Sequence, residues 1–316
     1  MDNLCHTLVG AALAKSGLER RTALAAGTLM IAANLPDIDA LAVPFGDIQL
    51  DIRRGWTHGV LAMLVLPFVL TALVALWHRV VRRGVVRAGQ PAFDSTQLFL
   101  LSLIGILSHP ALDWLNTYGV RLLMPTSREW FFGDTLFIVD PWLLLALGVG
   151  TWWSWRARKS GRPRWTWGAR AALAVSVLYI GAMRALHDVG ESATRAELSL
   201  EGAEYRRLMV APEPANPLTR AILVDEGETY RSGTVRFAPR PVVTWDPRAI
   251  PVNEWTTASR AAARTPHGAR FLRWARFPFF VEHRRPDGRA DVWIGDARYV
   301  RGERDSWASI TVTVDP

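Results

Sequence analysis

Residues 60–77 have the sequence VLAMLVLPFVLTALVALW, which contains no charged side chain. Its length approaches the ~20 residues that a helix needs to cross the hydrocarbon core of a bilayer. The basic residues that follow it are His78, Arg79, Arg82, Arg83 and Arg87. A long apolar run that ends in a basic segment is typical of a transmembrane helix that ends at the cytoplasmic face. The sequence therefore predicts an integral membrane protein.

Further apolar stretches lie on both sides of this one. The long stretches are Leu98–Leu115, Phe137–Trp155 and Ala169–Leu186, and the short ones are Leu4–Leu18 and Thr22–Leu35. Basic loops around Arg20 and from Arg156 to Arg164 separate them. Short basic loops stay in the cytoplasm. An arrangement of six spans places all three basic loops on the cytoplasmic side, namely these two and the basic segment that follows residue 77. We expect a mainly α fold, a polytopic bundle of about six transmembrane helices of which the first two are short, followed by a small antiparallel β-rich soluble domain.

The chain changes character after about Leu186, where Pro, Gly and Arg are frequent and no spanning run occurs. A boundary near 188–194 is expected, with a transmembrane domain at 1–190 and an extracytoplasmic β-rich domain at 195–316. Alternating patterns predict strands at 221–224, 229–237, 277–283, 290–294 and 307–314. Residues 216–218 are expected in a connecting loop. This half of the chain shows no catalytic constellation, and its role is left open.

Composition excludes some classes of function. The formal net charge is +8, but much of the basic charge flanks apolar runs, where it sets orientation, so nucleic-acid binding is not expected. The single cysteine, Cys5, cannot form an internal disulfide. No basic residue precedes the first apolar run, so we expect that run to be retained rather than cleaved. A Gly-rich phosphate loop, a serine nucleophile elbow and an HExxH motif are absent from the sequence.

Ionisable side chains gather at one membrane face in the six-span arrangement. Those at or near the outer ends of spans are His6, Asp37, Asp39, His58, His109, Asp113, Asp140 and His187. His78 falls on the inner side, and His267 and His283 are expected at the surface. Ionisable groups at membrane depth are costly unless they are paired or lie in a wet cavity, so they are functional candidates. Their shared level makes a single site possible, with Asp140 and His187 as the weaker members.

Residues 108–117, SHPALDWLNT, are the most informative segment. His109, Asp113 and Asn116 are spaced i, i+4, i+7 and share one face of a helix, so a single helix could offer two metal ligands. Pro110 would loosen the backbone beside the histidine. The alternative is a histidine at a helix end that is hydrogen-bonded to its own aspartate.

Two shorter segments carry further candidates, NLPDID at 34–39 and RGWTH at 54–58. Pro36 ends the preceding helix, which lets Asp37 and Asp39 turn back into a site. One carboxylate could bind a metal ion while its neighbour orients a histidine. The alternative is a polar helix stop without further function. Arg54 could hold a phosphate or another anion through two hydrogen bonds, and His58 begins the next span.

His6 with Gly10, then NLPDID, RGWTH and SHPALDWLNTYG in this order, resemble the YdjM-like family of bacterial inner-membrane proteins, described as membrane-bound metal-dependent hydrolases. The resemblance covers roughly residues 1–141, and its most specific part is the SHPALDWLNTYG block. The longer chain with an extra domain is similar to the YfhP-type members. The positions that match the family's polar residues are His6, Asp37, Asp39, His58, His109 and Asp113. The resemblance implies a location in the bacterial inner membrane.

A mixture of imidazole and carboxylate ligands suits a divalent transition metal, with zinc as the first expectation and manganese or iron as alternatives. The hypothesis is a metal-dependent hydrolase with the six matched residues as ligands. In it Asp39 is a ligand or the general base, and Asn116 and Arg54 contact the substrate or support the ligands. A site at the outer interface favours a membrane lipid or lipid-linked phosphoester. The rival is a non-catalytic membrane protein with a structural His/Asp cluster, whose C-terminal domain binds a partner.

Overall fold

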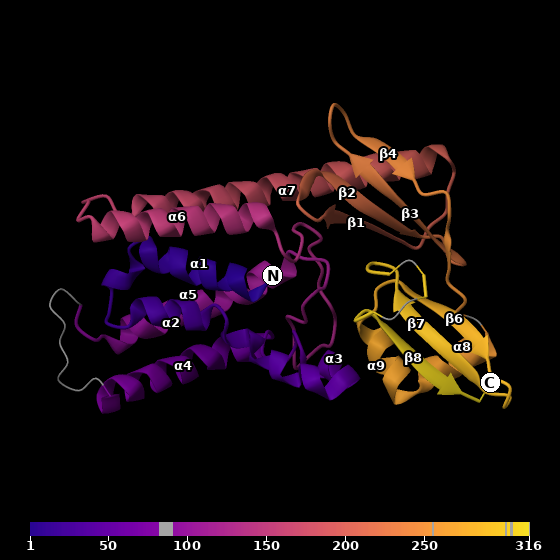
Figure 1. The fold of residues 1–316 in the computed structure, drawn as a ribbon, viewed down its shortest axis with the longest axis horizontal. Coiled ribbons are helices and arrows are strands. Elements are labelled where there is room, and N and C mark those ends of the chain that lie inside the picture. Colours follow the sequence, from indigo (N-terminus) through magenta and orange to yellow (C-terminus); the bar gives the residue numbers. More distant parts are fainter. Residues whose placement is uncertain (82–90, 255, 301, 304–305, 316) are drawn as a thin grey trace. The chain divides into compact units, whose positions relative to one another are not determined.

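The computed structural model describes residues 1–81, 91–254, 256–300, 302–303 and 306–315 (Figure 1). The chain forms two compact units. A helical unit comprises Met1–Val43 and Ile52–Arg184, and a mainly β unit comprises Pro44–Asp51 and Ala185–Pro316. Arg82, Arg83 and Arg87 of the expected basic loop lie outside the described residues.

Each of the six apolar stretches contains a helix. These are α1 (Asn3–Lys15), α2 (Ala25–Ala32), α4 (Val60–Val81), α5 (Ser95–Trp114), α6 (Pro141–Lys159) and α7 (Trp167–Leu200). Two 3-10 helices, η1 (Leu18–Arg20) and η2 (Leu35–Ile48), and the short α3 (Gln49–Ile52) fill the connections. α1 packs on α2, α5 and α6, and α5 also packs on α2 and α4. Figure 1 shows α6 running alongside α7.

Three helices, α4, α5 and α7, are long and apolar enough to cross a membrane, and the bent pair 25–32 and 35–46 would make a fourth span. Six full spans are therefore not confirmed. α1 has 13 residues and α2 has 8, which corresponds to helices of about 20 Å and 12 Å. Both fall short of a hydrocarbon core of about 30 Å. α6 has 19 residues, but Arg156, Arg158 and Lys159 occupy its last turn.

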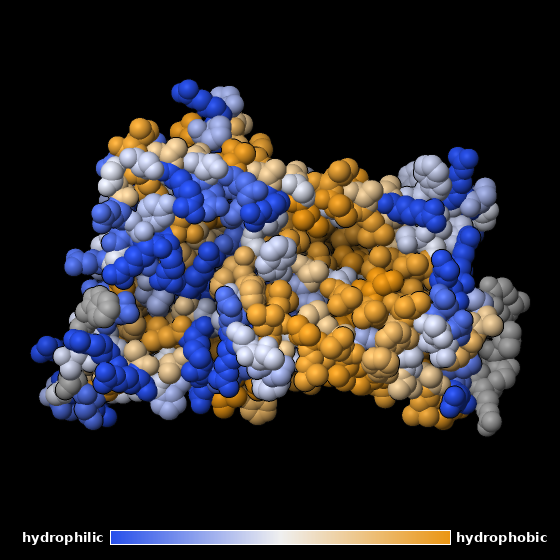
Figure 2. All heavy atoms as spheres, turned by 180° about the vertical axis from the view of Figure 1, so that it is seen from behind, coloured by the Kyte–Doolittle hydropathy of each residue, from blue (hydrophilic) through white to orange (hydrophobic). Residues whose placement is uncertain are grey.

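The surface of the helical unit carries many large exposed apolar side chains. On α4 the side chains of Phe68 and Leu73 are 64% and 59% exposed. Figure 2 shows hydrophobic side chains in a broad band over this unit. Single exposed apolar side chains are common, but a contiguous apolar surface of this extent is typical of a region that contacts a membrane or a partner. The band agrees with membrane insertion of the unit.

Glycines allow α1 and α5 to approach α2 closely. A Cβ at Gly10 of α1 would lie 2.7 Å from the Leu29 carbonyl oxygen of α2. A Cβ at Gly105 of α5 would lie 2.5 Å from the Cβ of Ala32 and 3.3 Å from the backbone nitrogen of Ala33. The backbones of α1 and α5 therefore touch α2 at positions where only glycine fits.

Replacing Gly105 with valine is expected to destabilise the purified protein by about 1–3 kcal/mol, because the added methyl groups overlap the backbone of α2. The matched control is Gly27→Val, since a Cβ at Gly27 of the same helix pair meets nothing within 4 Å. Thermal unfolding in detergent measures both variants. Equal melting temperatures for Gly105→Val and Gly27→Val would contradict the close approach.

The second unit contains two antiparallel sheets. The first consists of β1 (Arg207–Glu213), β2 (Asn216–Asp225), β3 (Thr229–Arg236), β4 (Val242–Trp245) and β5 (Ile250–Pro251), and the second of β6 (Pro278–Arg284), β7 (Ala290–Asp296) and β8 (Ser309–Val314). Helices α8 (Thr257–Arg264) and α9 (Pro266–Trp274) pack on the second sheet. A shared core that includes Met209, Tyr230, Phe277 and Trp293 joins the two sheets.

The expected hairpins at 225–228 and 285–288 are present, with Asp225 paired to Tyr230 and Arg284 paired to Ala290. The loop expected at 216–218 is wrong, because these residues begin β2. Pro217 is tolerated there because the pairing of β1 and β2 shifts at a bulge next to Glu213, where the ladder needs no amide hydrogen from it. α7 runs without a break through 188–194, and α8 and α9 were not expected.

Candidate metal centre

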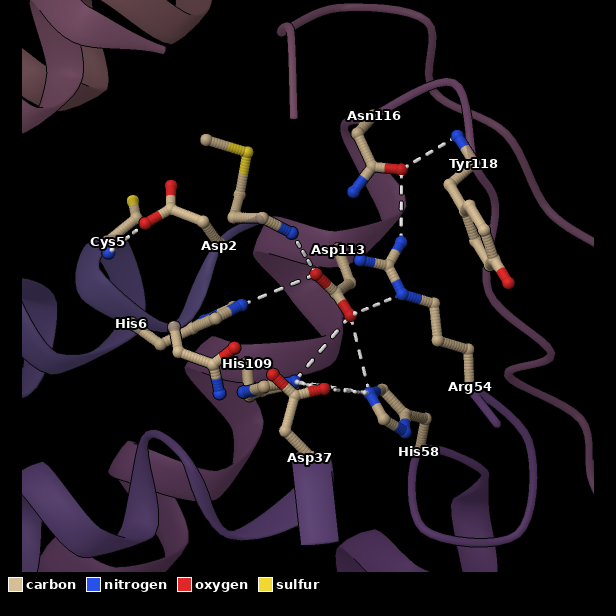
Figure 3. Close-up of polar contacts among 12 residues, drawn as sticks. Asp2, Cys5, His6, Asp37, Arg54, His58, His109, Asp113, Asn116 and Tyr118 are labelled. Atoms are coloured by element: carbon tan, nitrogen blue, oxygen red, sulfur yellow. Dashed lines mark hydrogen bonds and ion pairs between the residues drawn. The ribbon is translucent and has the colours of Figure 1, made fainter. Parts of the chain in front are cut away.

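Four ionisable side chains meet at one end of the helical unit. They are Asp37 of η2, His58 from the turn before α4, and His109 and Asp113 from the end of α5 (Figure 3). Each offers one nitrogen or oxygen, and these four atoms all lie within 4.8 Å of one another. His58, His109 and Asp113 are completely buried. The i, i+4 spacing on α5 places its histidine and aspartate on the same face, as the sequence predicts.

The distances among these atoms match the edges of a tetrahedron. The Nε2 atoms of His58 and His109 are 3.1 Å apart. The Oδ2 atom of Asp113 lies 3.3 Å and 3.5 Å from them, and the Oδ1 atom of Asp37 lies 3.8 Å and 3.5 Å from them. Donors bound to one zinc ion at about 2.1 Å in tetrahedral geometry lie about 3.4 Å from one another. The four donors thus surround a space of the right size for a metal ion.

A backbone carbonyl fixes the orientation of His109. Its Nδ1 atom lies 2.6 Å from the carbonyl oxygen of Ala33 at the end of α2. A carbonyl only accepts hydrogen bonds, so Nδ1 carries the hydrogen and donates it. In the neutral ring the lone pair then lies on Nε2, which points into the cluster. Gly105 permits this contact, because it brings α5 against α2.

Asp39 and Thr57 fix the orientation of His58 in the same way. The Thr57 hydroxyl donates to Oδ2 of Asp39 at 2.7 Å, and its oxygen lies 2.9 Å from Nδ1 of His58. The hydroxyl hydrogen is already used, so the ring nitrogen donates to that oxygen. Oδ2 of Asp39 also lies 3.3 Å from the same Nδ1 atom. The lone pair of neutral His58 therefore also points into the cluster.

The electrostatics of the cluster call for a positive charge at its centre. Two imidazole lone pairs face each other at 3.1 Å, and two carboxylate oxygens lie beside them. Buried acceptors without a donor between them repel one another, and a proton or a cation relieves the repulsion. Two imidazoles and two carboxylates, with both rings held in place through their Nδ1 atoms, form a ligand group that fits a divalent metal ion.

Asp113 connects this cluster to a second group of polar atoms. Its Oδ1 atom accepts from the amino group of Met1 and lies 3.3 Å from Nε2 of His6. The His6 ring stacks on the His109 ring with 3.7 Å between the centroids. His6 therefore lies beside the four donors and contacts the far oxygen of Asp113. Its own Nδ1 atom is buried without a hydrogen-bond partner.

Arg54 supplies a second positive charge beside Asp113, in addition to the amino group of Met1. Its Nε atom lies 3.3 Å from Oδ2 of the carboxylate, and its Nη1 atom donates to Oδ1 of Asn116 at 3.1 Å. The guanidinium lies over the Tyr118 ring at 4.7 Å. Arg54 has a φ of 50°, a region that is uncommon outside glycine and is found at functional sites.

Asn116 organises the turn that ends α5. Its side-chain oxygen also accepts from the backbone nitrogen of Tyr118 at 2.9 Å. Its Nδ2 atom is buried and has no hydrogen-bond partner. The turn thus leaves one amide donor available close to the cluster.

Comparison with known proteins identifies the family. A family model described as YdjM inner membrane protein matches residues 1–188. The chain belongs to the YdjM inner membrane protein family. It is also similar to the uncharacterized protein YfhP of Bacillus subtilis (strain 168), with 24% identity over 122 residues, which cover 38% of this chain and 34% of that protein. The match therefore spans about a third of the relative's length. No solved structure matches the chain.

The family match covers every residue of the polar cluster and agrees with the three candidate membrane helices. The resemblance expected from the sequence is confirmed. Of the six residues expected as ligands, the structure gathers Asp37, His58, His109 and Asp113 around one point. Asp39 lies behind His58, and His6 lies beyond Asp113.

The weaker candidates lie in other settings. Asp140 accepts from the backbone nitrogens of Trp142 and Leu143 and caps α6, and the Tyr179 hydroxyl donates to it at 2.9 Å. His187 belongs to the second unit and contacts the Val210 carbonyl at 2.9 Å. His78 stacks on Phe93, and His283 pairs with Glu303.

Two groups that orient the ligands, the Ala33 carbonyl and the Thr57 hydroxyl, were not expected from the sequence. The Ala33 carbonyl belongs to the backbone, so its residue type gives no signal. Thr57 precedes His58 directly, and a hydroxyl next to a candidate ligand is the signal that could have identified it.

Replacing Asp39 with asparagine is expected to weaken zinc affinity by about 10–100-fold without abolishing binding, because the change leaves the four donors but alters the partner of the His58 ring. Competition with a chromophoric chelator measures this affinity in purified protein. Asp51→Asn is the control, since Asp51 lies in the second unit. Complete loss of binding in Asp39→Asn would instead indicate that Asp39 is itself a ligand.

Proposed function

We propose that the chain is a membrane-bound, metal-dependent hydrolase that acts on a phosphoester or lipid-linked substrate at the outer membrane interface. Zinc is the preferred ion, and manganese and iron are the alternatives, because imidazole and carboxylate ligands suit all three. The proposal includes a multi-pass arrangement in the bacterial inner membrane, with residues 1–190 as the membrane domain and residues 195–316 as an extracytoplasmic domain.

One observation carries the proposal. The four donor atoms lie at tetrahedral spacing, and each of the two imidazole rings is held in its orientation by a contact at its Nδ1 atom, on the side away from the cluster. Metal-binding histidines generally donate the hydrogen of their second nitrogen to a carbonyl or a carboxylate, which fixes the ring. His109 uses the Ala33 carbonyl in this way, and His58 uses Thr57 and Asp39. A helix-end histidine that merely contacts its own aspartate would need neither support.

In this proposal, residues around the four donors have separate chemical roles. A bound divalent ion would supply a Lewis acid that activates water near neutral pH and polarises the bond to be cleaved. Asp39 has one buried oxygen, Oδ1, without a hydrogen-bond partner, and it could accept a proton as general base. The free Nδ2 donor of Asn116 could hold a phosphoryl oxygen. Arg54 stabilises the charge of Asp113, and its guanidinium could also contact the substrate.

The surroundings of the cluster favour a substrate that arrives through the membrane. Ile38 and Leu41, close to the two carboxylates of η2, are 52% and 74% exposed. An apolar rim next to a polar centre suits an amphiphile whose chains remain in lipid while its head group reaches the donors. The short basic loops around Arg20 and from Arg156 to Arg164 favour the cytoplasmic side for their end of the bundle. The other end, which holds the cluster, would then lie at the outer face.

A non-catalytic role is the second candidate, and the geometry gives it a specific argument. Structural zinc sites have four protein ligands, whereas catalytic sites keep a position open for water or substrate. Four donors at tetrahedral spacing could close the shell. In that case the ion would tie η2, α4 and α5 together, and the second unit would bind a partner.

An assay of the full-length chain in detergent separates the two candidates. The probes are bis-p-nitrophenyl phosphate as a soluble phosphodiester and short-chain phosphatidic acid as a lipid phosphomonoester. The hydrolase proposal predicts release of nitrophenol or phosphate that disappears with a chelator and returns with zinc. Asp37→Ala is expected to be inactive, and His267→Ala is expected to remain active. A protein that holds zinc but hydrolyses neither probe would contradict the proposal and support the structural role.

A further inference from the structure

The second unit contains a basic groove that is independent of the metal centre. The groove lies between the first sheet and helices α8 and α9, and its cavity volume is about 420 Å³. This volume falls within the range of small-molecule pockets, about 300–1,000 Å³. The two sheets of this unit share a core, and the Tyr230 hydroxyl of the first sheet donates to the Pro278 carbonyl of the second at 2.7 Å.

Arginines dominate the charged residues of the groove. Its charged lining residues are Arg206, Arg207, Arg260, Arg264, Asp225 and Glu254. Arg207 donates to Oδ2 of Asp225 through Nε and Nη2 at 3.0 Å and 2.8 Å. The other oxygen of Asp225 accepts from the backbone nitrogen of Gly227 at 3.0 Å. This buried carboxylate is therefore neutralised inside the structure.

The other three arginines of the groove have guanidinium groups that are not paired with a carboxylate in the described part of the chain. Within the described part of the chain, neither Arg206 nor Arg264 pairs with a carboxylate, and Arg260 contacts only the Thr256 carbonyl. Glu254 is the remaining acidic lining residue. Arg206 lies along Gly227, where a Cβ would be 3.5 Å from its Nη2 atom. Three arginines thus face one space against a single carboxylate.

We infer that this groove binds a phosphate group, carried either by a lipid head group or by a soluble molecule. Guanidinium groups present planar, paired donors that match phosphate oxygens, and several of them around one space balance a doubly charged anion. The lining of the groove also contains Val252, Leu272 and Phe280, which suits the apolar part of a ligand attached to the phosphate. The inference does not depend on the proposed hydrolase activity.

Calorimetric titration of the purified full-length chain with inorganic phosphate tests the site. Saturable binding is expected, and the double variant Arg206→Gln/Arg264→Gln is expected to weaken it by at least about tenfold, because two charge-assisted hydrogen bonds are lost. Arg240→Gln/Arg284→Gln is the matched control, since it removes the same charge from exposed positions outside the groove. The variant His109→Ala distinguishes phosphate binding in the groove from binding at the metal centre. It is expected to bind phosphate as tightly as the wild type.

Short-chain phosphatidic acid and phosphatidylcholine in the same detergent distinguish the two sources. Tighter binding of phosphatidic acid than of phosphate assigns the groove to a lipid head group, and equal binding assigns it to a soluble phosphate. The inference is overturned by the absence of saturable binding, by equal weakening in both double variants, or by loss of binding in His109→Ala. Far-ultraviolet circular dichroism checks folding, and Arg264→Gln alone replaces the double variant if that variant does not fold.

Discussion

Replacing Asp113 with asparagine is expected to abolish metal binding and to destabilise the purified protein by about 3–5 kcal/mol. The carboxylate is completely buried, and Arg54, His58, His109 and His6 all contact it. Asparagine removes the negative charge, which deprives the ion of a ligand and leaves a buried guanidinium without its counter-charge. Elemental analysis and thermal unfolding of the same detergent preparation measure the two effects.

Asp94→Asn is the control for this variant, because Asp94 lies at the other end of α5. The side chain of Asp94 accepts from the backbone nitrogens of Thr96 and Gln97 and caps the helix. Asparagine caps helices about as well as aspartate. Metal content and melting temperature are expected to stay close to those of the wild type. An Asp113→Asn protein that behaves like this control would refute the central place of Asp113 in the cluster.

Replacing Arg54 with glutamine is expected to make the stability of the protein depend on the metal ion. Without the guanidinium, the metal-free protein holds a buried carboxylate that has lost one of the two cationic groups in contact with it, the other being the amino group of Met1, at a cost of about 3–5 kcal/mol. A bound cation can replace that partner, and its binding stabilises the folded state. Addition of zinc should therefore raise the melting temperature of Arg54→Gln by more than it raises that of the wild type.

The neighbouring residue provides the control for this comparison. Arg53 has the same charge and is half-buried, but in the described residues it pairs with no carboxylate of the cluster. Arg53→Gln is expected to respond to zinc like the wild type. If zinc raised the melting temperatures of both variants equally, Arg54 would not contribute to balancing the charge of Asp113.

The long helices and the hairpins of this protein are predictable from local patterns. The apolar runs of α4, α5 and α7 and the turn residues at 225–228 and 285–288 each specify an element without help from the rest of the chain. The role of the short helices α1 and α2 is not predictable in this way, because the sequence of a short apolar run does not reveal whether the run crosses a membrane. The Thr265-Pro266 pair that begins α9 is a helix-start signal, and it could have predicted that helix.

The composition of the polar cluster was also accessible from the sequence. The i, i+4 spacing of His109 and Asp113 fixes two donors, and the assumption of a shared membrane level brings Asp37 and His58 to them. The division of roles was not accessible, since it depends on contacts between segments far apart in the chain. The sequence does not reveal that Asp39 lies behind His58 or that the Ala33 carbonyl holds His109.

The metal content of the purified full-length chain tests the central claim most directly. After incubation with zinc and removal of the excess, the tetrahedral donor set predicts about one ion per chain. His109→Ala is expected to lose this ion, and His267→Ala, which changes a histidine of the second unit, is expected to retain it. A wild-type protein that retains no ion, or a His109→Ala protein that retains as much as the wild type, would contradict the account.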